Sequence, residues 1–294
     1  MTSYIDTKIV CLTSQSASIK LNGTYMSSVK YNLGTIIRND RDIIHRQVQL
    51  LNAQIPYSFY VINYTNNLFK YSILSFPAIT ITVPVGNYTA NSLISTLKSL
   101  VDTANGDTTF MATIDSINGN MTFTYQYDWT LYNNFTYSIG NVLGFNPNTV
   151  YNNVYPTSSI FADYPLNLLG IKTLQVRSSN LIMNNISSVQ GGATTLLQSI
   201  PVSAVPFGMI DFVDKGQNLI TIHNDLLDDL DIEIVDGESG EYINFNNQDW
   251  CITLAFHLTR EVGGNAVGGN APLRPPTTSG IVPTTSGIVL VGFF

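Results

Sequence analysis

The sequence predicts an all-β protein: a single jelly-roll β-sandwich of two four-stranded antiparallel sheets, with one short helix and extended N- and C-terminal arms. Segments rich in β-branched and aromatic residues recur along the chain between Asn, Gly, Pro and Asp turns, as in sandwiches and barrels. Their number suffices for two four-stranded sheets, the strand count of a jelly roll. Hydrophobic residues make up 44% of the 294 residues, so the chain can bury a sizeable core.

The stretch CITLAFHL (251–258) shows the strand pattern most clearly. Every second residue from Ile252 to Leu258 is apolar, which places Cys251 and His257 on the outer face. LDIEIVD (230–236) is expected to behave likewise, with Asp231 and Glu233 outward. Other strands are expected at 17–25, 48–54, 57–63, 66–74, 78–86, 110–128 (a hairpin), 170–178, 208–214 and 218–224.

Residues 87–106 break the β rhythm and predict one short helix. Thr89 or Asn91 is a candidate cap, and Gly106 follows its end. We expect this helix to lie across one end of the sandwich. Its apolar stripe consists of Leu93, Ile94, Leu97, Leu100 and Val101.

The chain is expected to divide into three parts. Residues 1–45 form an N-terminal arm with a peripheral strand, residues 46–261 the jelly-roll domain, and residues 262–294 a C-terminal arm rich in Gly, Pro and Thr. Within the domain, 146–168 and 179–206 lack periodicity, so we expect long loops that serve as contact surfaces.

The C-terminal arm contains the direct repeat TTSGIV, at 277–282 and 284–289. Such a segment has no core of its own, so we expect a partner to hold it. The residues expected to dock are Ile281, Ile288, Val289, Leu290, Val291, Phe293 and Phe294.

Charge is scarce. Only 11% of the residues are charged, against about 25% in typical globular chains, so we expect neighbours to cover much of the surface. The net charge of −7 and the absence of a basic patch argue against direct nucleic-acid binding. No charged, apolar leader opens the chain and no apolar run approaches about 20 residues, so we expect cytosolic synthesis and no membrane span.

No motif predicts catalysis or a cofactor. His45, His223 and His257 lie on different segments without zinc-ligand spacing. Cys11 and Cys251 are 240 positions apart and are expected to be reduced thiols in the core. Neither a GxSxG elbow nor a phosphate-binding loop is present. We expect a protein that is not an enzyme, without cofactor or metal.

An acidic run at 225–241 leaves two interpretations open. Its carboxylates supply the oxygen ligands that Ca²⁺ prefers, but their spacing matches no calcium loop. The favoured interpretation is a solvated, charged edge that discourages unwanted strand pairing.

Five phrases between residues 45 and 258 carry a family resemblance. They are QVQLLNAQIPYSFYVIN, ITVPVGNYTANSLISTLKSLV, NVLGF, NLLGIKTLQVRSSNL and NFNNQDWCITLAF. In this order they resemble the penton and minor capsid proteins of large double-stranded DNA viruses and their virophage and polinton-like relatives. Residues 1–44 and the repeated tail fall outside the resemblance.

The resemblance implies a single jelly roll that builds icosahedral capsids and resides in the virion after synthesis and assembly in the host cytoplasm. We favour a penton subunit that forms a homopentamer at the fivefold vertices; a minor capsid protein that cements major-capsid trimers is the alternative. The expected partners are further copies of the chain, the major capsid protein and other minor capsid proteins.

The sequence also leaves open a function of another class, namely carbohydrate binding. With 16 Tyr and two Trp able to stack on sugars, and the acidic run able to hold Ca²⁺, the sandwich would suit a calcium-dependent carbohydrate-binding protein. This alternative predicts exposed Trp side chains.

Overall fold

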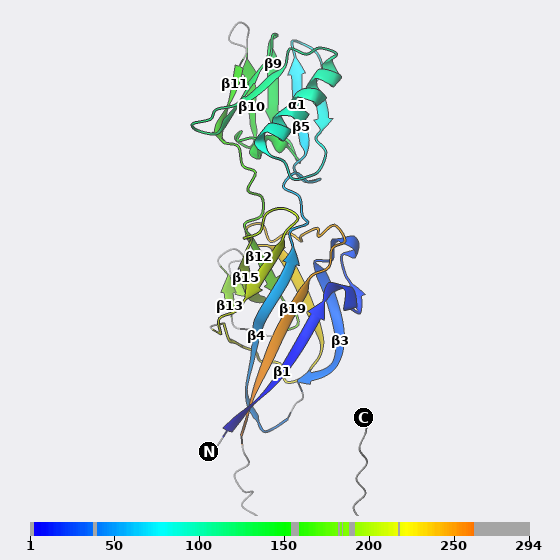
Figure 1. Cartoon of the computed structure of the whole chain (residues 1–294), viewed down its shortest axis with the longest axis vertical. Coiled ribbons are helices and arrows are strands. Elements are labelled where there is room, and N and C mark those ends of the chain that lie inside the picture. Colours follow the sequence, from blue (N-terminus) through cyan, green and yellow to red (C-terminus); the bar gives the residue numbers. More distant parts are fainter. Residues whose placement is uncertain are drawn as a thin grey trace, which may run out of the picture.

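The chain forms two parts joined by two neighbouring linkers (Figure 1). The computed structural model describes residues 3–261 except 38–39, 154–158, 182, 184, 188–191 and 217. One part is a β-sandwich built from both ends of this range, and the other is formed by the middle of the chain. Within the described residues, no helix is long and apolar enough to cross a bilayer.

The sandwich consists of two antiparallel sheets. The first has the order β1-β19-β4-β16, and β17 also pairs with β4; the second has the order β15-β12-β18-β3-β2. The strands are β1 (Ser3–Thr13), β2 (Ile19–Lys20), β3 (Ser28–Ile37), β4 (Ile43–Pro56), β12 (Thr173–Arg177), β15 (Leu196–Pro201), β16 (Met209–Val213), β17 (Ile220–Thr221), β18 (Leu227–Asp236) and β19 (Cys251–Glu261). A small separate sheet pairs β13 (Asn185–Ser187) with β14 (Gly192–Thr194).

The strand order is that of a jelly roll. Without the short β2 and β17, the sandwich strands in chain order are β1, β3, β4, β12, β15, β16, β18 and β19. The first pairs with the last, the second with the seventh, the third with the sixth and the fourth with the fifth. This is a long hairpin rolled into two four-stranded sheets. The predicted fold class is confirmed.

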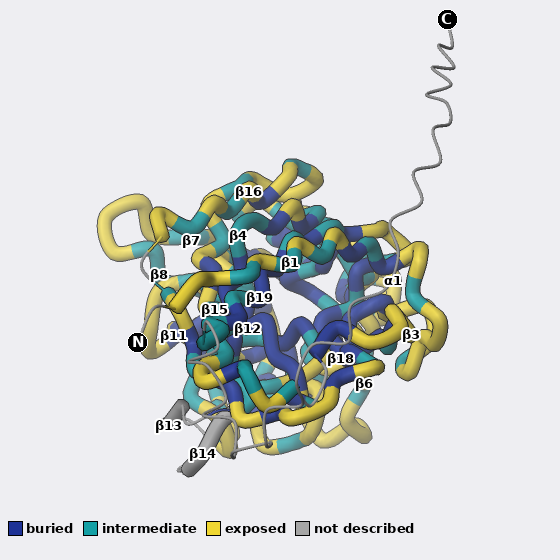
Figure 2. The backbone as a smooth tube through the Cα atoms, turned by 90° about the horizontal axis from the view of Figure 1, so that it is seen from below, coloured by how far each residue is buried: buried dark blue, intermediate teal, exposed yellow. Residues whose placement is uncertain are grey.

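Alternation of side chains builds the sandwich core. In β19, Ile252, Leu254, Phe256 and Leu258 are buried, and Cys251, Thr253 and His257 are only partly buried on the other face, as predicted. Apolar residues of the second sheet, such as Leu230 and Ile232 of β18, complete the same core. Figure 2, viewed along the long axis, shows the buried strand segments in the middle with exposed segments around them.

The inserted part, residues 62–168, has a core of its own. Its strands form the sheets β10-β9-β5-β6 and β11-β8-β7. They are β5 (Leu68–Ile73), β6 (Ile79–Thr82), β7 (Met111–Ile114), β8 (Asn120–Thr124), β9 (Trp129–Asn133), β10 (Thr149–Asn153) and β11 (Ser159–Pro165). The buried residues of this core and those of the sandwich form two separate clusters.

The predicted helix is α1 (Ala90–Asn105). The Thr89 side chain accepts from the Ser92 backbone N–H, the Ser92 hydroxyl accepts from the Thr89 N–H, and Gly106 ends the helix at a φ of 71°. The helix buries Leu93 and Leu97 in the core of the inserted part. It therefore does not cross the end of the sandwich as expected, because its apolar stripe packs against β6 and β7.

The expected division into parts differs from the structure at the N-terminus. Residues 1–45 contain β1 and β3, which are full members of the two sheets rather than an arm. In β1 the inward positions include two charged residues, Asp6 and Lys8; Asp6 pairs with Arg260, and the Lys8 ammonium donates a hydrogen bond to the Ile36 carbonyl. These charges hid the alternation that would have identified the strand.

The two predicted loops also contain strands. Residues 146–168 include β10 and β11, and residues 179–206 include β15 of the second sheet. The first segment is rich in Asn and Tyr, and the pairing of its strands with β9 and β8 compensates for its weak apolar pattern. Contacts far apart in the sequence decide such strands.

The linkers to the inserted part meet closely. At Gly170, where φ is +62°, a Cβ atom would approach the Val61 side chain to 2.8 Å. Glycine is required both by this contact and by the positive φ. The ends of the insertion thus lie side by side.

Because the two cores are separate, they should be destabilised separately. Leu254→Ala in the sandwich and Leu97→Ala in α1 each remove a side chain that is 0% exposed. Each should lower the free energy of unfolding of its own part by about 2–5 kcal/mol. Differential scanning calorimetry should show two transitions, each shifted by one variant. A single transition shifted equally by both variants would contradict two independent cores.

Candidate assembly surfaces

The outer face of the first sheet is almost free of charge. The outward positions of its two central strands hold uncharged polar or small side chains, apart from one Cys and two His. On β19 they are Cys251, Thr253, Ala255, His257 and Thr259, and on β4 they are His45, Gln47, Gln49, Asn52 and Gln54. Such a face suits burial against another protein, because covering it strips water from few charges.

The three histidines come together on neighbouring strands of this sheet. His257 of β19 lies opposite Gln47 and His45 opposite Thr259, and His223 follows β17, whose Thr221 also lies opposite Gln47. The His257 ring is 3.1 Å from the Thr7 hydroxyl and 3.3 Å from the Gln49 amide oxygen. Within the described part of the chain, no group of His, Cys, Asp or Glu is arranged to hold a metal ion.

The two cysteines lie on the same outer face. Cys11 is exposed and Cys251 partly buried, and both are free thiols. The expectation that both are thiols in the core is therefore wrong for their location. Burial, and secondly the nearby Cys11, raises the pKa of the Cys251 thiol, which disfavours the reactive thiolate.

Both edges of the first sheet expose apolar side chains. At one edge, Ile5 and Ile9 of β1 are each 64% exposed. At the other edge, Val213 of β16 is 72% exposed, and Phe207 in the preceding turn is 77% exposed. Contiguous exposed apolar surface marks contact sites on soluble proteins. The sheet thus has two different candidate contact surfaces on opposite edges.

The turn before β16 holds Phe207 in a strained conformation. Its φ is +68°, which is rare for a bulky residue. Two backbone bonds fix the turn: Phe207 N–H donates to the Tyr57 carbonyl at 2.8 Å, and Tyr57 N–H donates to the Gly208 carbonyl at 2.9 Å. The fold therefore keeps an aromatic ring in solvent at a cost in conformational energy, which is typical of functional positions.

The residues expected to form the docking arm, from Ile281 to Phe294, lie outside the described residues. The structure does describe where the arm begins. Glu261, the last residue of β19, lies directly opposite Ser3, the first residue of β1. The arm leaves the sandwich at this end.

An ion cluster fixes the end from which the arm leaves. The Arg260 guanidinium lies 2.8 Å from Asp42, 3.2 Å from Asp40 and 3.5 Å from Asp6. The hydrogen bond from Arg260 holds the pKa of the Asp42 carboxyl below its usual value, and the same bond raises the pKa of Arg260. The cluster ties the connection between β3 and β4 to the last strand.

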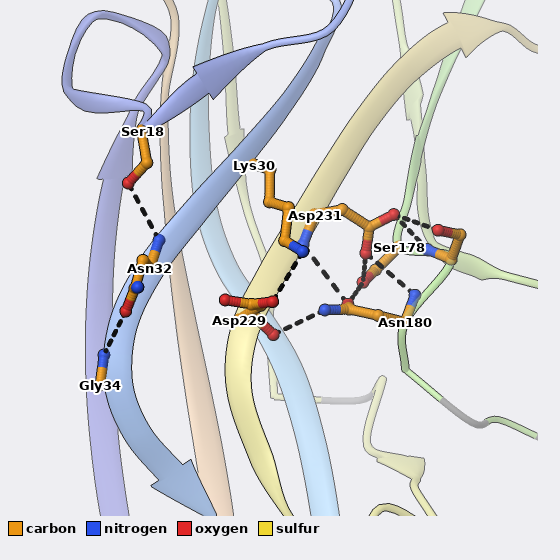
Figure 3. A network of polar contacts seen from close by, with 9 residues as sticks. Ser18, Lys30, Asn32, Gly34, Ser178, Asn180, Asp229 and Asp231 are labelled. Carbon is orange, nitrogen blue, oxygen red and sulfur yellow. Dashed lines mark hydrogen bonds and ion pairs between the residues drawn. The ribbon is translucent and has the colours of Figure 1, made fainter.

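The acidic run is largely structural at its centre. Asp231 points to the outer face of the second sheet as expected, since Leu230, Ile232 and Ile234 fill the core, but it is only 7% exposed because it organises the turn after β12, which covers it (Figure 3). Its carboxylate accepts from the Ser178 hydroxyl at 3.0 Å, from the Asn180 N–H at 2.9 Å and from the Ser179 N–H at 2.8 Å. The carboxylate thus replaces water for three donors that the turn brings inside.

Other acidic residues of the run are exposed. Asp229 pairs with Lys30 at 2.6 Å on the surface of the second sheet. Glu238 lies 3.3 Å from Lys172, and Asp225 lies 3.4 Å from Arg46. These residues are charged and solvated as predicted, but β18 lies between β12 and β3 in its sheet, so the run does not form the charged sheet edge that was expected.

A cleft lies at the junction of the two parts. Its volume is about 590 Å³, and its lining includes Tyr25, Tyr60, Tyr64 and Tyr242 together with Asp236, Glu238 and Glu241. Tyrosines of this kind can stack on a sugar ring, which the carbohydrate alternative requires. That alternative also predicts exposed tryptophans, but Trp129 is 3% exposed and Trp250 is 1% exposed. This part of the carbohydrate prediction is wrong.

A buried tyrosine network belongs to the inserted part. Tyr71 donates to the Asn105 amide oxygen at 2.8 Å, and Tyr125 donates to Asp107. Burial raises the pKa of Tyr71 to about 12 and also raises the pKa of Tyr125. Burial alone would raise the pKa of Asp107, but the bonds from Tyr125 and Thr109 outweigh it and lower the value. The network holds the C-terminal end of α1 on the sheets.

Two solved structures are similar to this chain. One is the mavirus penton protein, with 9% identity and a TM-score of 0.46, covering 88% of this chain and 100% of that one. The other is a chain of the Sputnik virophage, with 13% identity and a TM-score of 0.44, covering 86% of this chain and 97% of that one. No family model and no curated protein matches. Because both TM-scores lie below 0.5, the fold assignment rests on the strand order of the chain itself.

The buried Asp231 should contribute more to stability than its exposed neighbour Asp229. Asp231→Asn keeps the shape but presents an amide to donors, so unfolding should become easier by about 1–3 kcal/mol. Asp229→Asn, the matched control on the same strand, breaks only a surface ion pair and should cost less than about 1 kcal/mol. Chemical denaturation measures both. Equal losses would show that the turn does not depend on Asp231.

The Arg260 cluster should make the sandwich sensitive to acid. The folded-state pKa of Asp42 lies below its unfolded-state value, which is about 4. Its contribution is therefore complete above that value and is lost as the pH falls through the folded-state pKa. Thermal unfolding of Asp42→Asn should change less between about pH 6 and about pH 3 than that of the unaltered chain. Asp228→Asn, at an exposed residue, is the charge-matched control and should retain the full acid sensitivity.

Proposed function

We propose that the protein is a structural subunit of an icosahedral capsid, and specifically the penton subunit at the fivefold vertices. The observation that carries the proposal is the first sheet of the jelly roll: the outward positions of its two central strands hold no Asp, Glu, Lys or Arg, and both of its edges expose apolar side chains. Surface charge keeps a monomeric protein soluble, so a sheet of this kind is unfavourable in a protein that works alone in water. It suits a subunit whose sheet is covered by neighbours.

The two edges favour a ring rather than a symmetric pair. A twofold dimer uses the same patch on both copies, whereas a head-to-tail contact joins two different patches and closes into a ring when the rotation allows. The apolar residues of β1 and those around β16 lie on opposite edges of one sheet. They suit contacts with two different neighbours. The number five comes from the resemblance of the sequence phrases to penton proteins.

The remaining partners follow from the same role. A vertex subunit contacts the major capsid protein and other minor capsid proteins, and it resides in the virion after assembly in the host cytoplasm. The inserted part lies at the end of the sandwich opposite the point where the arm leaves (Figure 1). It therefore leaves the base of the sandwich free for these contacts.

The arm is proposed to strengthen assembly without belonging to the folded core. The described strands end at Glu261, and Leu258 is the last residue of the sandwich core among the described residues. Deleting residues 263–294 should therefore preserve the thermal unfolding of both parts but shift the oligomer toward free subunits.

Native mass spectrometry across a range of concentrations tests the proposal. The full chain should form a closed oligomer of five copies of the 32.3-kDa chain, and the deleted chain should form fewer. A strict monomer or a trimer would exclude the penton role and favour a cementing minor capsid protein. If the deletion unfolded the sandwich instead, the arm would have to be assigned to the core.

A further inference from the structure

The β1 edge is the most accessible strand edge of the sandwich. β1 has 11 residues, whereas the other edge strands β16, β15 and β2 have 5, 6 and 2. Its register against β19 runs without a shift from Ser3 opposite Glu261 to Thr13 opposite Cys251. The edge is therefore long and regular, with no bulge to turn it away from a further strand.

β1 lacks most of the usual protections of an open edge. Natural edges carry proline, bulges, outward lysine or inward-pointing charges to prevent pairing with another chain, and of these β1 has only the inward charges of Asp6 and Lys8, which contact Arg260 and the Ile36 carbonyl. Lys8, the one lysine of β1, instead directs its amino group inward to the Ile36 carbonyl at 2.7 Å. The outward positions hold Ile5 and Ile9, each 64% exposed, and exposed Cys11. Such an edge invites strand addition.

The chain itself carries a segment with the composition of a matching strand. Residues 284–294, TTSGIVLVGFF, contain no charge and no proline, and residues 288–291 are all β-branched or Leu. High β propensity without charge is the composition of segments that pair with open edges. Exposed in water, such a segment is prone to aggregate, so a specific partner strand would stabilise it.

We propose that residues 284–291 of one copy add to the first sheet of a neighbouring copy as a strand antiparallel to β1. The added strand would satisfy the outer backbone groups of β1, and alternate side chains would cover Ile5 and Ile9. This inference rests on the proposed assembly and names the surface that receives the arm.

The connection favours the neighbouring copy over the same one. The arm leaves the sandwich at Glu261, next to the start of β1. A strand added antiparallel to β1 would begin beside the other end of β1, which is about 36 Å away for a strand of 11 residues. If the arm paired with β1 of its own copy, the added strand would run parallel to β19. Residues 262–283 would then have to form a crossover that returns over the sheet from the end of β19 to the start of the added strand. Long structureless crossovers are uncommon in compact domains. The glycines and the prolines at 272, 275, 276 and 283 also prevent pairing close to the exit.

Native Cys11 provides the probe, because its side chain shares the outer face of β1 with Ile5 and Ile9. One chain keeps Cys11 and carries Cys251→Ser. The second carries Cys11→Ser and Cys251→Ser together with Thr284→Cys, Thr285→Cys, Ser286→Cys or Gly287→Cys, one at a time, because an antiparallel strand that covers Ile5 and Ile9 brings this part of the arm beside Cys11. The two full-length chains are mixed, assembled and oxidised, and disulfide-linked pairs are measured on non-reducing gels.

Strand addition predicts alternation. Cross-links should form at alternate positions of 284–287 and be lost at those between, because successive side chains of a strand point to opposite faces. In the first chain, Cys11→Ser with Phe76→Cys moves the thiol to an exposed position of the inserted part and should abolish the links. Ile9→Lys, which places a charge at the edge, should strongly reduce them.

Other patterns would overturn the inference. Equal cross-linking at all four positions would indicate unspecific apolar contact, and no cross-linking would exclude β1 as the receiving edge. A disulfide that forms only when both cysteines are in one chain would make the same copy the occupant. A pentamer in native mass spectrometry without these cross-links would remove the inference and leave the proposed function intact. Absence of any closed oligomer would remove the proposed penton role.

Discussion

Pairing of the last described strand with the first determines how the molecule is arranged. β19 lies between β1 and β4 and pairs with both along nearly its whole length. Because the chain's first strand must sit beside its last, the rest of the chain has to fold as a rolled hairpin between them. Both ends of the sandwich chain therefore lie together at one end, and β1 is left as an outer edge.

Trp250 stabilises this arrangement where β19 begins. Its ring is 1% exposed, and its Nε1–H donates to the Met26 carbonyl at 2.7 Å. Ser14, just after β1, bonds to the Trp250 backbone in both directions at 3.0 and 3.1 Å. One residue thus connects the last strand with the turns that follow β1 and precede β3.

The sequence predicted well wherever local pattern and final environment agree. β19 alternates strictly and is half-buried, and α1 has both its cap at Thr89 and its glycine end. Prediction failed where distant contacts compensate for poor local pattern, as for the inward charges Asp6 and Lys8 of β1. The second core escaped prediction because its strands have the same composition as those of the sandwich, and composition does not say which strands pair.

The candidate surfaces were less predictable than the fold. Low charge indicated covered surface, but exposure of a given apolar residue depends on where its strand lies in the sheet. Ile5 and Ile9 belong to the segment expected to form an N-terminal arm, and their exposure follows from the position of β1 at an edge of the sheet. The same holds for Phe207, whose exposure follows from two backbone bonds to Tyr57.

These exposed residues cannot be explained by the stability of the single chain. Burying a side chain such as Ile is worth about 1.5–3 kcal/mol, and Ile5 and Ile9 forgo most of that gain while 64% exposed. Phe207 adds backbone strain to the same loss. The gain becomes available only when another surface covers them. With few charges to desolvate at the outer face of the same sheet, association recovers this energy at little electrostatic cost, so the fold of one copy is best understood as part of an assembly.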